Sequence, residues 1–256
     1  MAQTRQQMRL LKLAKSLEDG RALHLKDAAS LLDVSEMTIR RDIAGSDGQF
    51  SFLGGYIVSS MDQPSSRDYF LQRENFTNVE AKREACASAA SLIEPGDIIF
   101  IDCGTTLPYL AKNLAPILPL TIICYSINIA DIVCRMPNAK IILLGGEYHP
   151  ASASFASDES IELLAKMGIN KAFISAGGLH FQNGLTCSNF FEVRIKQMAM
   201  SRAESNILVM DSTKIGKVRT ASFATIDQID ILATDSGITA EQRELFATLD
   251  IDVRSH

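Results

Sequence analysis

Seven short apolar runs recur between residues 98 and 253, and stretches with helical spacing separate most of them. The runs cover residues 98–101, 121–124, 141–144, 172–175, 207–210, 229–233 and 251–253, and the expected helices cover 78–93, 106–115, 128–136, 158–167, 190–204 and 239–248. Strands that are apolar on both faces and alternate with helices form a mostly parallel sheet covered on both sides. The sequence therefore predicts an α/β domain with an open sheet over residues 78–256.

The first 58 residues follow a different pattern, that of short helices. Apolar residues at helical spacing predict helices over residues 3–18 and 26–32. Residues 33–34 then form a tight turn, and Ser35 is a preferred N-cap for a third helix. Two short helices joined by a tight turn are typical of a helix-turn-helix that reads DNA.

The third helix is expected to present polar side chains to a partner. Ile39 and Ile43 share its buried face, so the neighbouring polar side chains face outward. Ser and Thr at a helix start contact phosphates, and Arg contacts phosphates or guanine edges. The candidate DNA-binding residues are Lys26, Ser35, Glu36, Thr38, Arg40 and Arg41. An ordinary helical hairpin with these residues on its surface is the alternative.

A hairpin or wing is expected directly after these helices. Residues 50–58 form its two strands, with Gly54 and Gly55 at the turn. Residues 59–75 are rich in Ser, Asp and Pro, a composition typical of a linker. We therefore expect a winged helix-turn-helix domain at residues 1–58, a linker at 59–77 and the α/β domain at 78–256.

Charge is distributed unevenly along the chain. The whole chain carries a net charge of −5, whereas residues 1–58 carry eight Lys or Arg against seven Asp or Glu. Because attraction to phosphate depends on the local face, the acidic total does not exclude DNA binding. The local excess of one positive charge is modest, so binding should depend on dimerisation and on a few well-placed contacts.

Cysteine usage and hydropathy bear on the compartment. Five cysteines, an odd number without CxxC spacing, favour free thiols in a reducing cytosol over a disulfide framework. No apolar run approaches the roughly 18 residues that a membrane span needs, and the first residues lack the apolar stretch of a secretory signal. We expect a cytoplasmic protein with no membrane partner and no resident cofactor.

Small and polar residues follow most of the expected strands. In open α/β sheets the carboxyl ends of the strands converge and bind ligands. Gly104, Thr105 and Thr106 open a helix and offer amides and hydroxyls to an anion, and Lys214 offers a point charge. Singly, each is also explained by an ordinary turn or a solvated lysine. The candidate effector-binding residues at these ends are Asp102, Gly104, Thr105, Thr106, Tyr125, Ser126, Gly145, Gly146, Gly177, Gly178, Asp211 and Lys214.

Glu192 and Lys196 lie four residues apart on one expected helix. They form either an exposed ion pair worth a few tenths of a kcal/mol or two pocket side chains that hold sugar hydroxyls, and on the second interpretation they join the effector-binding candidates. His149 and His180 follow strand ends, but no metal-type spacing links them to the cysteines. Satisfied loop histidines and buried thiols are therefore expected rather than a metal site.

These motifs together resemble one family. Residues 35–43, Ser-Glu-Met-Thr-Ile-Arg-Arg-Asp-Ile, are similar to the DeoR-type repressor signature S-x-x-T-I-R-R-D-L, and Gly54-Gly55 resembles the wing glycines of that family. Further motifs in the family's order are Asp102–Thr106, Gly145-Gly146, Gly184-Leu185-Thr186, Glu192 with Lys196, and Asp211–Lys214 with Gly216. The wing departs from the family, because residues 50–53 lack the Arg that many members carry before the glycines. A wing contact to DNA is therefore left open.

The resemblance implies a winged DNA-binding domain and a sensor related in fold to sugar-phosphate isomerases. It also implies a repressor that a phosphorylated sugar releases from DNA. Finer matches at residues 23–29, 53–58, 124–126 and 216–219 resemble one branch of the family, and that branch implies deoxyribose-5-phosphate as effector and control of deoxynucleoside catabolism. We expect a homo-oligomer, a dimer or larger, whose partners are double-stranded operator DNA and a phosphorylated sugar.

Two other functions stay open on the sequence alone. A sugar-phosphate isomerase with an accessory N-terminal module needs a carboxylate base, for which Asp102, Glu147 and Glu192 are candidates. A sugar-phosphate-binding module whose helix-turn-helix serves only for dimerisation needs no operator. Turnover of pentose phosphates would identify the first, and an operator affinity that Arg40→Ala leaves unchanged would favour the second.

Overall fold

The computed structural model describes residues 5–17, 23–44, 46, 50–53, 56–59 and 77–255. The chain forms two compact units, Met1–Ser66 and Arg67–His256. Most of the expected linker, residues 60–76, lies outside the described residues. The domain boundaries therefore stay a prediction.

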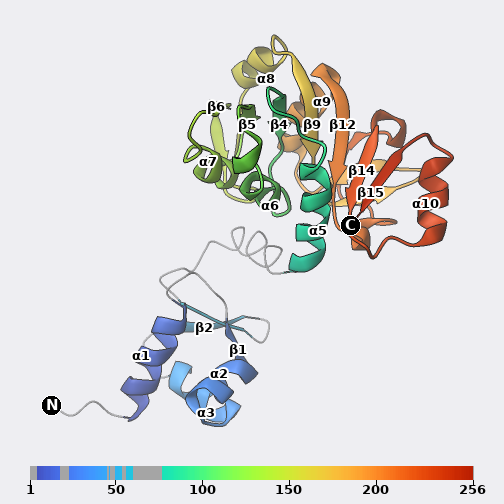
Figure 1. Ribbon diagram of the computed structural model, residues 1–256. Helices are drawn as coiled ribbons and strands as arrows, with labels where there is room; N and C mark the ends of the chain where they lie inside the picture. Colours follow the sequence, from blue (N-terminus) through green and yellow to red (C-terminus); the bar gives the residue numbers. More distant parts are fainter. Residues whose placement is uncertain are drawn as a thin grey trace. The chain divides into compact units, whose positions relative to one another are not determined.

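In its described residues, the N-terminal unit combines three helices with a small antiparallel sheet (Figure 1). Its elements are α1 (Arg5–Leu17), β1 (Leu23–His24), α2 (Leu25–Leu32), α3 (Glu36–Ala44), β2 (Phe50–Leu53) and β3 (Tyr56–Ser59). The strands lie in the order β1–β3–β2, and both pairs are antiparallel. This arrangement is that of a winged helix-turn-helix, as predicted; the expected wing glycines 54 and 55 lie outside the described residues.

Apolar side chains from all three helices form the core of this unit. Ile39 and Ile43 are buried, which confirms the buried face predicted for the third helix. They belong to one cluster with Leu13, Leu17, Leu25, Ala28, Ala29, Phe50 and Ile57. Arg9 adds a bidentate ion pair across the unit, since its Nε and Nη2 lie 2.6 and 3.0 Å from the two carboxylate oxygens of Asp42. The core and this pair fix α3 against α1.

The C-terminal unit is built on a seven-stranded, fully parallel sheet of order β15–β14–β12–β9–β4–β5–β6. Its strands are β4 (Ile98–Ile101), β5 (Thr121–Cys124), β6 (Lys140–Leu143), β9 (Ile169–Ile174), β12 (Ala203–Val209), β14 (Ile231–Thr234) and β15 (Asp252–Ser255). Every strand expected from the apolar runs is present, with ends shifted by a few residues. The predicted α/β class is therefore confirmed.

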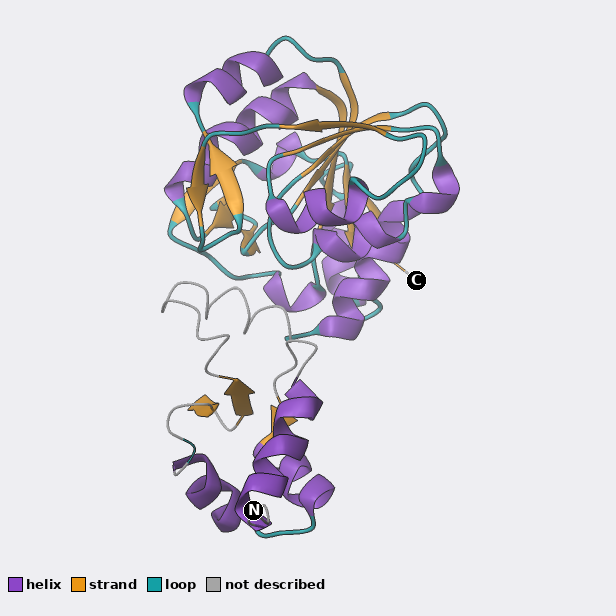
Figure 2. Ribbon diagram, turned by 90° about the vertical axis from the view of Figure 1, so that its left-hand side faces the viewer, coloured by secondary structure: helices purple, strands orange, loops and turns teal. Residues whose placement is uncertain are grey.

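Helices flank both faces of this sheet (Figures 1 and 2). One buried cluster joins the sheet to α5 (Val79–Ala90), α6 (Leu107–Lys112) and α7 (Ile127–Val133). A second cluster on the other face includes residues of α8 (Asp158–Leu164), α9 (Val193–Arg202) and α10 (Ala240–Ala247). Short 3-10 helices η2, η3, η4 and η5 cover Ala115–Ile117, Phe190–Glu192, Ser212–Lys214 and Ile226–Gln228.

Two small antiparallel sheets were not predicted. One is a hairpin of β7 (Glu147–His149) and β8 (Ser154–Ala156). The other has the order β10–β11–β13 and contains β10 (Gly178–His180), β11 (Gly184–Cys187) and β13 (Ala221–Ala224). Both follow carboxyl ends of the parallel strands, and residues from them line the site described below.

No helix in the described part of the chain is long and apolar enough to cross a membrane. The five cysteines are free thiols, of which Cys134 is exposed and the other four are buried.

Candidate DNA-binding and effector sites

A left-handed residue makes the tight turn between α2 and α3. Asp33 adopts φ 51°, a conformation that Asp tolerates better than most residues, and follows the last residue of α2. The Val34 amide then donates back to the Ala29 carbonyl at 3.1 Å, which closes the end of α2. The chain therefore reverses within three residues, and α3 begins at Glu36.

The side chain of Ser35 caps α3, as predicted. Its Oγ accepts the Thr38 amide at 3.2 Å and lies 2.9 Å from the Thr38 Oγ1. Both hydroxyls are therefore held at the positive end of the helix, where phosphate groups bind favourably.

Beyond this cap, α3 presents charged side chains to solvent. Arg40 and Arg41 are exposed, as are Glu36 and Met37, whereas Thr38 is half-buried. Lys26 is exposed near the start of α2. The predicted DNA-binding residues therefore lie on or beside α2 and α3, and the two arginines are accessible to a duplex.

In the C-terminal unit the strand order reverses between β4 and β9. From β4 the chain proceeds to β5 and β6 on one side, and β9, β12, β14 and β15 lie on the other. Ligands of open α/β sheets bind at such a switch point, outside the carboxyl ends of the strands. Residues 102–106 follow β4 and residues 175–177 follow β9, so both segments lie at this position.

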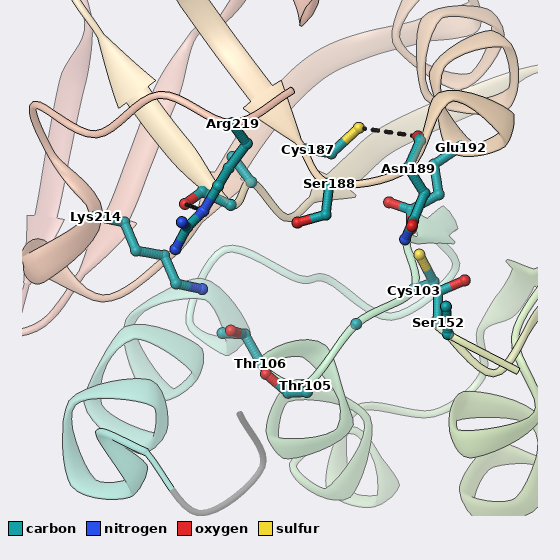
Figure 3. A pocket seen from close by; sticks show the side chains of 14 residues that line it. Cys103, Thr105, Thr106, Ser152, Cys187, Ser188, Asn189, Glu192, Lys214 and Arg219 are labelled. Carbon is teal, nitrogen blue, oxygen red and sulfur yellow. Dashed lines mark hydrogen bonds between the residues drawn. The ribbon is translucent and has the colours of Figure 1, made fainter. Parts of the chain in front are cut away.

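A cavity of about 520 Å³ occupies this switch point. Figure 3 shows Lys214 and Arg219 on one side of it and Glu192, Asn189, Cys103 and Ser152 on the other. Thr105 and Thr106 lie at the bottom of the same view, below Lys214. The complete lining consists of Cys103, Gly104, Thr105, Thr106, Ala151, Ser152, Ala176, Gly177, Cys187, Ser188, Asn189, Glu192, Lys214 and Arg219.

The cavity therefore has two chemically different ends. The cationic end combines Lys214 and Arg219 with the hydroxyls of Thr105 and Thr106. Helix α6, which follows these threonines, has only six residues, so the cations and hydroxyls, rather than the helix dipole, are the groups here that could attract an anion. The other end offers the Glu192 carboxylate and the Asn189 amide, groups that bind hydroxyls.

Lys82 lies behind the cationic end. This lysine of α5 is only 1% exposed, and its Nζ donates to Thr105 Oγ1 at 2.9 Å. Gly104, just before, adopts φ 106°, where only glycine is unstrained, and a Cβ there would lie 3.3 Å from Ser175 Oγ. The loop after β4 is thus fixed from two sides.

Asp102 is fully buried and joins four elements behind the cavity. Its Oδ1 accepts from the Cys103 amide at 2.8 Å and from Tyr125 Oη at 2.5 Å. Its Oδ2 accepts from the amide and hydroxyl of Ser175 at 2.8 and 3.0 Å, and from Lys196 Nζ. Because these donors occupy both oxygens, Asp102 holds the ends of β4, β5 and β9 against α9 and does not line the cavity.

Lys196 and Glu192 are both buried, so the interpretation as an exposed ion pair is wrong. Lys196 Nζ lies 3.7 Å from Glu192 Oε2 and donates to the Ser175 carbonyl at 3.1 Å. Burial alone would lower the pKa of Lys196, but the Asp102 and Glu192 carboxylates outweigh it and hold that pKa above its ordinary value. Glu192 reaches the cavity and accepts from the Asn189 amide at 2.6 Å, whereas Lys196 stays behind it.

Asp211 is also buried and faces Lys214. Its Oδ2 lies 3.6 Å from Lys214 Nζ, and its Oδ1 accepts from Asn78 Nδ2 at 3.1 Å and from Thr213 Oγ1. Burial alone would raise the pKa of Asp211. The hydrogen bond from Thr213, the charge of Lys214 and the hydrogen bond from Asn78 outweigh burial, and they lower that pKa below its ordinary value of 3.8. Asp211 is therefore a charged support for Lys214 rather than a lining residue.

The segment 215–219 carries Arg219 to the cavity. The Gly216 amide donates to the Leu179 carbonyl at 2.7 Å, and Arg219 Nε donates to the Gly177 carbonyl at 3.1 Å. A Cβ on Gly178 would lie 2.4 Å from the Lys217 carbonyl oxygen, so glycine permits this close crossing.

Six predicted effector residues line the cavity: Gly104, Thr105, Thr106, Gly177, Glu192 and Lys214. Eight do not, namely Asp102, Tyr125, Ser126, Gly145, Gly146, Gly178, Lys196 and Asp211. Tyr125 and Ser126 are buried after β5, and the two glycines at 145–146 form the turn between β6 and β7, where Ser160 Oγ donates to the Gly145 carbonyl at 2.6 Å.

The main lining residues that sequence reasoning missed are Ser152, Ser188, Asn189 and Arg219. Ser152 lies in the turn of the β7–β8 hairpin, and Ser188 and Asn189 follow β11. Because β7, β8 and β11 were not expected as strands, the sequence did not indicate that the residues beside them lie near the cavity. For Arg219, the basic pair at 217 and 219 after a strand end was the available signal.

His149 and His180 are the last residues of β7 and β10, not loop residues as expected. His149 stacks on Phe191 with ring centroids 3.8 Å apart. His180 Nδ1 accepts the backbone amides of Gln182 and Asn183 at 3.2 and 3.4 Å. Within the described ranges no group of three or more His, Cys, Asp or Glu residues could hold a metal ion.

The chain combines a winged helix-turn-helix that exposes two arginines with an α/β unit that carries a ligand-sized cavity. This combination defines a ligand-responsive DNA-binding regulator. Residues 9–59 match the DeoR-like helix-turn-helix domain, and residues 77–236 match the DeoR C terminal sensor domain. The chain therefore belongs to the DeoR family, a non-enzymatic family of sugar-responsive transcriptional repressors.

Individual relatives match nearly the whole chain. The deoxyribose operon repressor of Escherichia coli (strain K12) is 40% identical over 233 residues, which cover 91% of this chain and 92% of the relative. The HTH-type transcriptional regulator YulB of Bacillus subtilis (strain 168) is 31% identical over 220 residues, covering 85% and 84%. Among solved structures, ribose 5 phosphate isomerase A from Neisseria gonorrhoeae matches 54% of each chain with a TM-score of 0.41 and 15% identity, a similarity too weak to indicate a ligand or a reaction.

Family membership excludes the isomerase alternative, and the geometry explains why the three candidate bases are unsuitable. Both carboxylate oxygens of Asp102 already accept hydrogen bonds. Glu192 accepts a hydrogen bond from Asn189 and forms an ion pair with Lys196, and Glu147 does not line the cavity. The match to the DNA-binding family likewise assigns the helix-turn-helix to DNA, not to dimerisation alone.

Proposed function

We propose that this repressor controls genes of deoxynucleoside catabolism and that deoxyribose-5-phosphate releases it from its operator. The observation that carries the proposal is the two-ended cavity at the switch point of the sheet. Such a cavity matches a small molecule that has an anion at one end and hydroxyl groups at the other.

The cationic end suits a phosphate. Lys214 and Arg219 supply two positive charges, and Thr105 and Thr106 supply hydroxyl donors. Hydrogen bonds from charged donors to phosphate are roughly twice as strong as neutral ones. Lys82, buried behind Thr105, adds a further positive charge close to the same place.

The opposite end suits the sugar. Glu192 and Asn189 can accept hydrogen bonds from hydroxyls, and the Glu192 carboxylate repels a phosphate. A phosphorylated pentose therefore has one favoured orientation, with its phosphate at Lys214. The name of the 40% identical relative, a deoxyribose operon repressor, supports deoxyribose as the sugar.

On the DNA side, we assign base and phosphate contacts to Arg40 and Arg41, with Ser35 and Thr38 on phosphates and Lys26 and Glu36 beside them. The modest charge of residues 1–58 supports a homo-oligomer, since two recognition helices bind half-sites about 34 Å apart or a multiple of that distance. A repressor of this kind acts in the cytoplasm, where its operator is. The effector must favour a conformation with weak DNA affinity, and a coupling of about 1–3 kcal/mol gives a 5- to 150-fold change.

A thermal-shift panel tests the effector assignment. Deoxyribose-5-phosphate at 100 times its Kd should stabilise the full chain by about 2.7 kcal/mol, whereas free deoxyribose should not raise Tm. Lys214→Met should abolish the shift. Lys217→Met, an exposed lysine on the same loop that does not line the cavity, is the matched control and should respond like the wild type. Equal shifts with free and phosphorylated pentoses would contradict the proposal.

A further inference from the structure

Helix α5 is the first described helix of the C-terminal unit, and the residue before it has an unusual role. Asn78 is the N-cap residue of α5, yet its side chain makes no capping hydrogen bond. Instead its Nδ2 donates to Asp211 Oδ1 at 3.1 Å and to Thr213 Oγ1 at 2.9 Å, more than 130 positions away in the chain. Its left-handed backbone, φ 53°, is a conformation that Asn tolerates.

The partner of Asn78 is directly linked to the cationic end of the cavity. Asp211 is fully buried, and its Oδ2 accepts no hydrogen bond from any described residue. Lys214 Nζ is 3.6 Å from that oxygen, which is within ion-pair range but too long for a hydrogen bond. Lys214 therefore stands between a buried carboxylate and the cavity that it lines.

A second link connects α5 to the same end of the cavity. Lys82 lies one helical turn after Asn78, and its ammonium donates to Thr105 Oγ1. Thr105 lines the cavity on the loop after β4, and Lys214 lines it on the loop after β12. The start of α5 is thus hydrogen-bonded to Thr105 in the first of these loops. It is also hydrogen-bonded to Asp211 and Thr213 beside Lys214 in the second.

An anion bound at the cationic end of the cavity must change the electrostatic interactions of Asp211. A phosphate attracts the Lys214 ammonium and competes with Asp211 for it. The buried Asp211 carboxylate then depends more on its remaining donors, Thr213 and Asn78, because an uncompensated buried charge is unfavourable. Occupancy of the cavity therefore alters the hydrogen bond that holds the start of α5.

We propose that Asn78 is the positioning residue that transmits effector occupancy from Lys214 and Asp211 to the start of α5. α5 is the first described helix of the C-terminal unit, which follows the DNA-binding unit in the chain. The inference rests on the proposed function, since it requires an anionic effector in the cavity. Asn78 does not line the cavity, so its role is in coupling rather than in binding.

Two substitutions at Asn78 separate coupling from binding. Asn78→Gly removes the amide and keeps the left-handed backbone without strain. Asn78→Asp keeps size and backbone tolerance but replaces the donor by a carboxylate. The matched control is Asn138→Gly, which also removes an exposed Asn at a left-handed position (φ 66°), in the turn between α7 and β6.

The experiment measures two affinities on the full chain. An operator duplex is first selected from random DNA by the wild type, and its Kd is measured by fluorescence anisotropy with and without saturating deoxyribose-5-phosphate. The ratio of the two values is the coupling, and the effector Kd is measured separately by calorimetry. The wild type and Asn138→Gly should give a ratio of about 5 to 150.

Both Asn78 variants should lower this ratio at least about five-fold, which is the loss expected from one hydrogen bond to a charged group. Where the wild-type ratio is itself small, the variants should lower it to one. Their effector Kd and effector-free operator Kd should stay within about three-fold of wild type. A purely structural role would instead weaken effector binding itself. An unchanged ratio in whichever variant folds, or an effector Kd weakened together with the ratio, overturns the inference. A wild type whose operator Kd does not respond to deoxyribose-5-phosphate overturns the proposed function before any variant is compared.

Discussion

Replacing Lys196 with Met tests the buried ion pair that supports the effector cavity. Lys196 and Asp102 side chains are 1% and 0% exposed, so removal of the ammonium leaves a carboxylate that water cannot reach. Breaking such a pair costs about 3–5 kcal/mol. Four hydrogen-bond donors to Asp102 remain, from Cys103, Tyr125 and Ser175, so we expect the lower end, about 3 kcal/mol. For a unit of this size the Tm should fall by about 6–12 °C.

Arg194→Met is the matched control on the same helix. Arg194 pairs with Asp158, but their side chains are 66% and 74% exposed, so the substitution should change the free energy of unfolding by less than about 1 kcal/mol. Urea denaturation of both full-length variants, followed by far-UV circular dichroism, measures the difference. If Lys196→Met is no more destabilising than Arg194→Met, the reasoning about a buried, charge-compensated Asp102 is refuted.

Three further predictions concern the remaining groups. Arg40→Ala should weaken operator binding by about 1–3 kcal/mol in an anisotropy titration, and unchanged affinity would mean that α3 does not read DNA. Asp211→Asn should lower the free energy of unfolding at pH 7, and by progressively less as pH falls below 3.8. A carboxylate with a lowered pKa contributes its full stability above its ordinary value of 3.8 and loses it as pH falls through the folded pKa, so a pH-independent difference in urea denaturation would contradict this. A thiol reagent at pH 8 should label exposed Cys134 rapidly and Cys187 slowly, since burial raises the pKa of Cys187 to about 11, and equally fast labelling by mass spectrometry would contradict the described burial.

The sequence predicted the parallel sheet well because its strands are apolar on both faces, a pattern with few alternatives. Ile39, Ile43 and Ser35 were also placed correctly, since helical spacing and capping are local properties. The β10–β11–β13 sheet was missed because its strands interrupt their apolar residues with Gly, His, Thr or Ser, and because β11 pairs with the distant β13. Local patterns carry no information about such pairing.

Part of the cavity lining was predictable because the strands that precede it were predictable. Gly104, Thr105 and Lys214 follow strand ends, and the topology of a parallel sheet brings strand ends together. Arg219 reaches the cavity because segment 215–219 crosses Gly178, a tertiary contact that the basic pair at 217 and 219 does not by itself predict. Lys82 looks like a surface charge within a helical pattern, and only the fold places it behind Thr105.

On the proposed function, a sugar phosphate held at the cationic end of the cavity weakens the binding of the winged domain to DNA. Anisotropy titration of a labelled operator with the full chain tests it most directly, with deoxyribose-5-phosphate and deoxyribose compared at equal concentration. Saturating deoxyribose-5-phosphate should raise the operator Kd by about 5- to 150-fold, and free deoxyribose should leave it unchanged. An operator Kd that no sugar phosphate alters would contradict the claim.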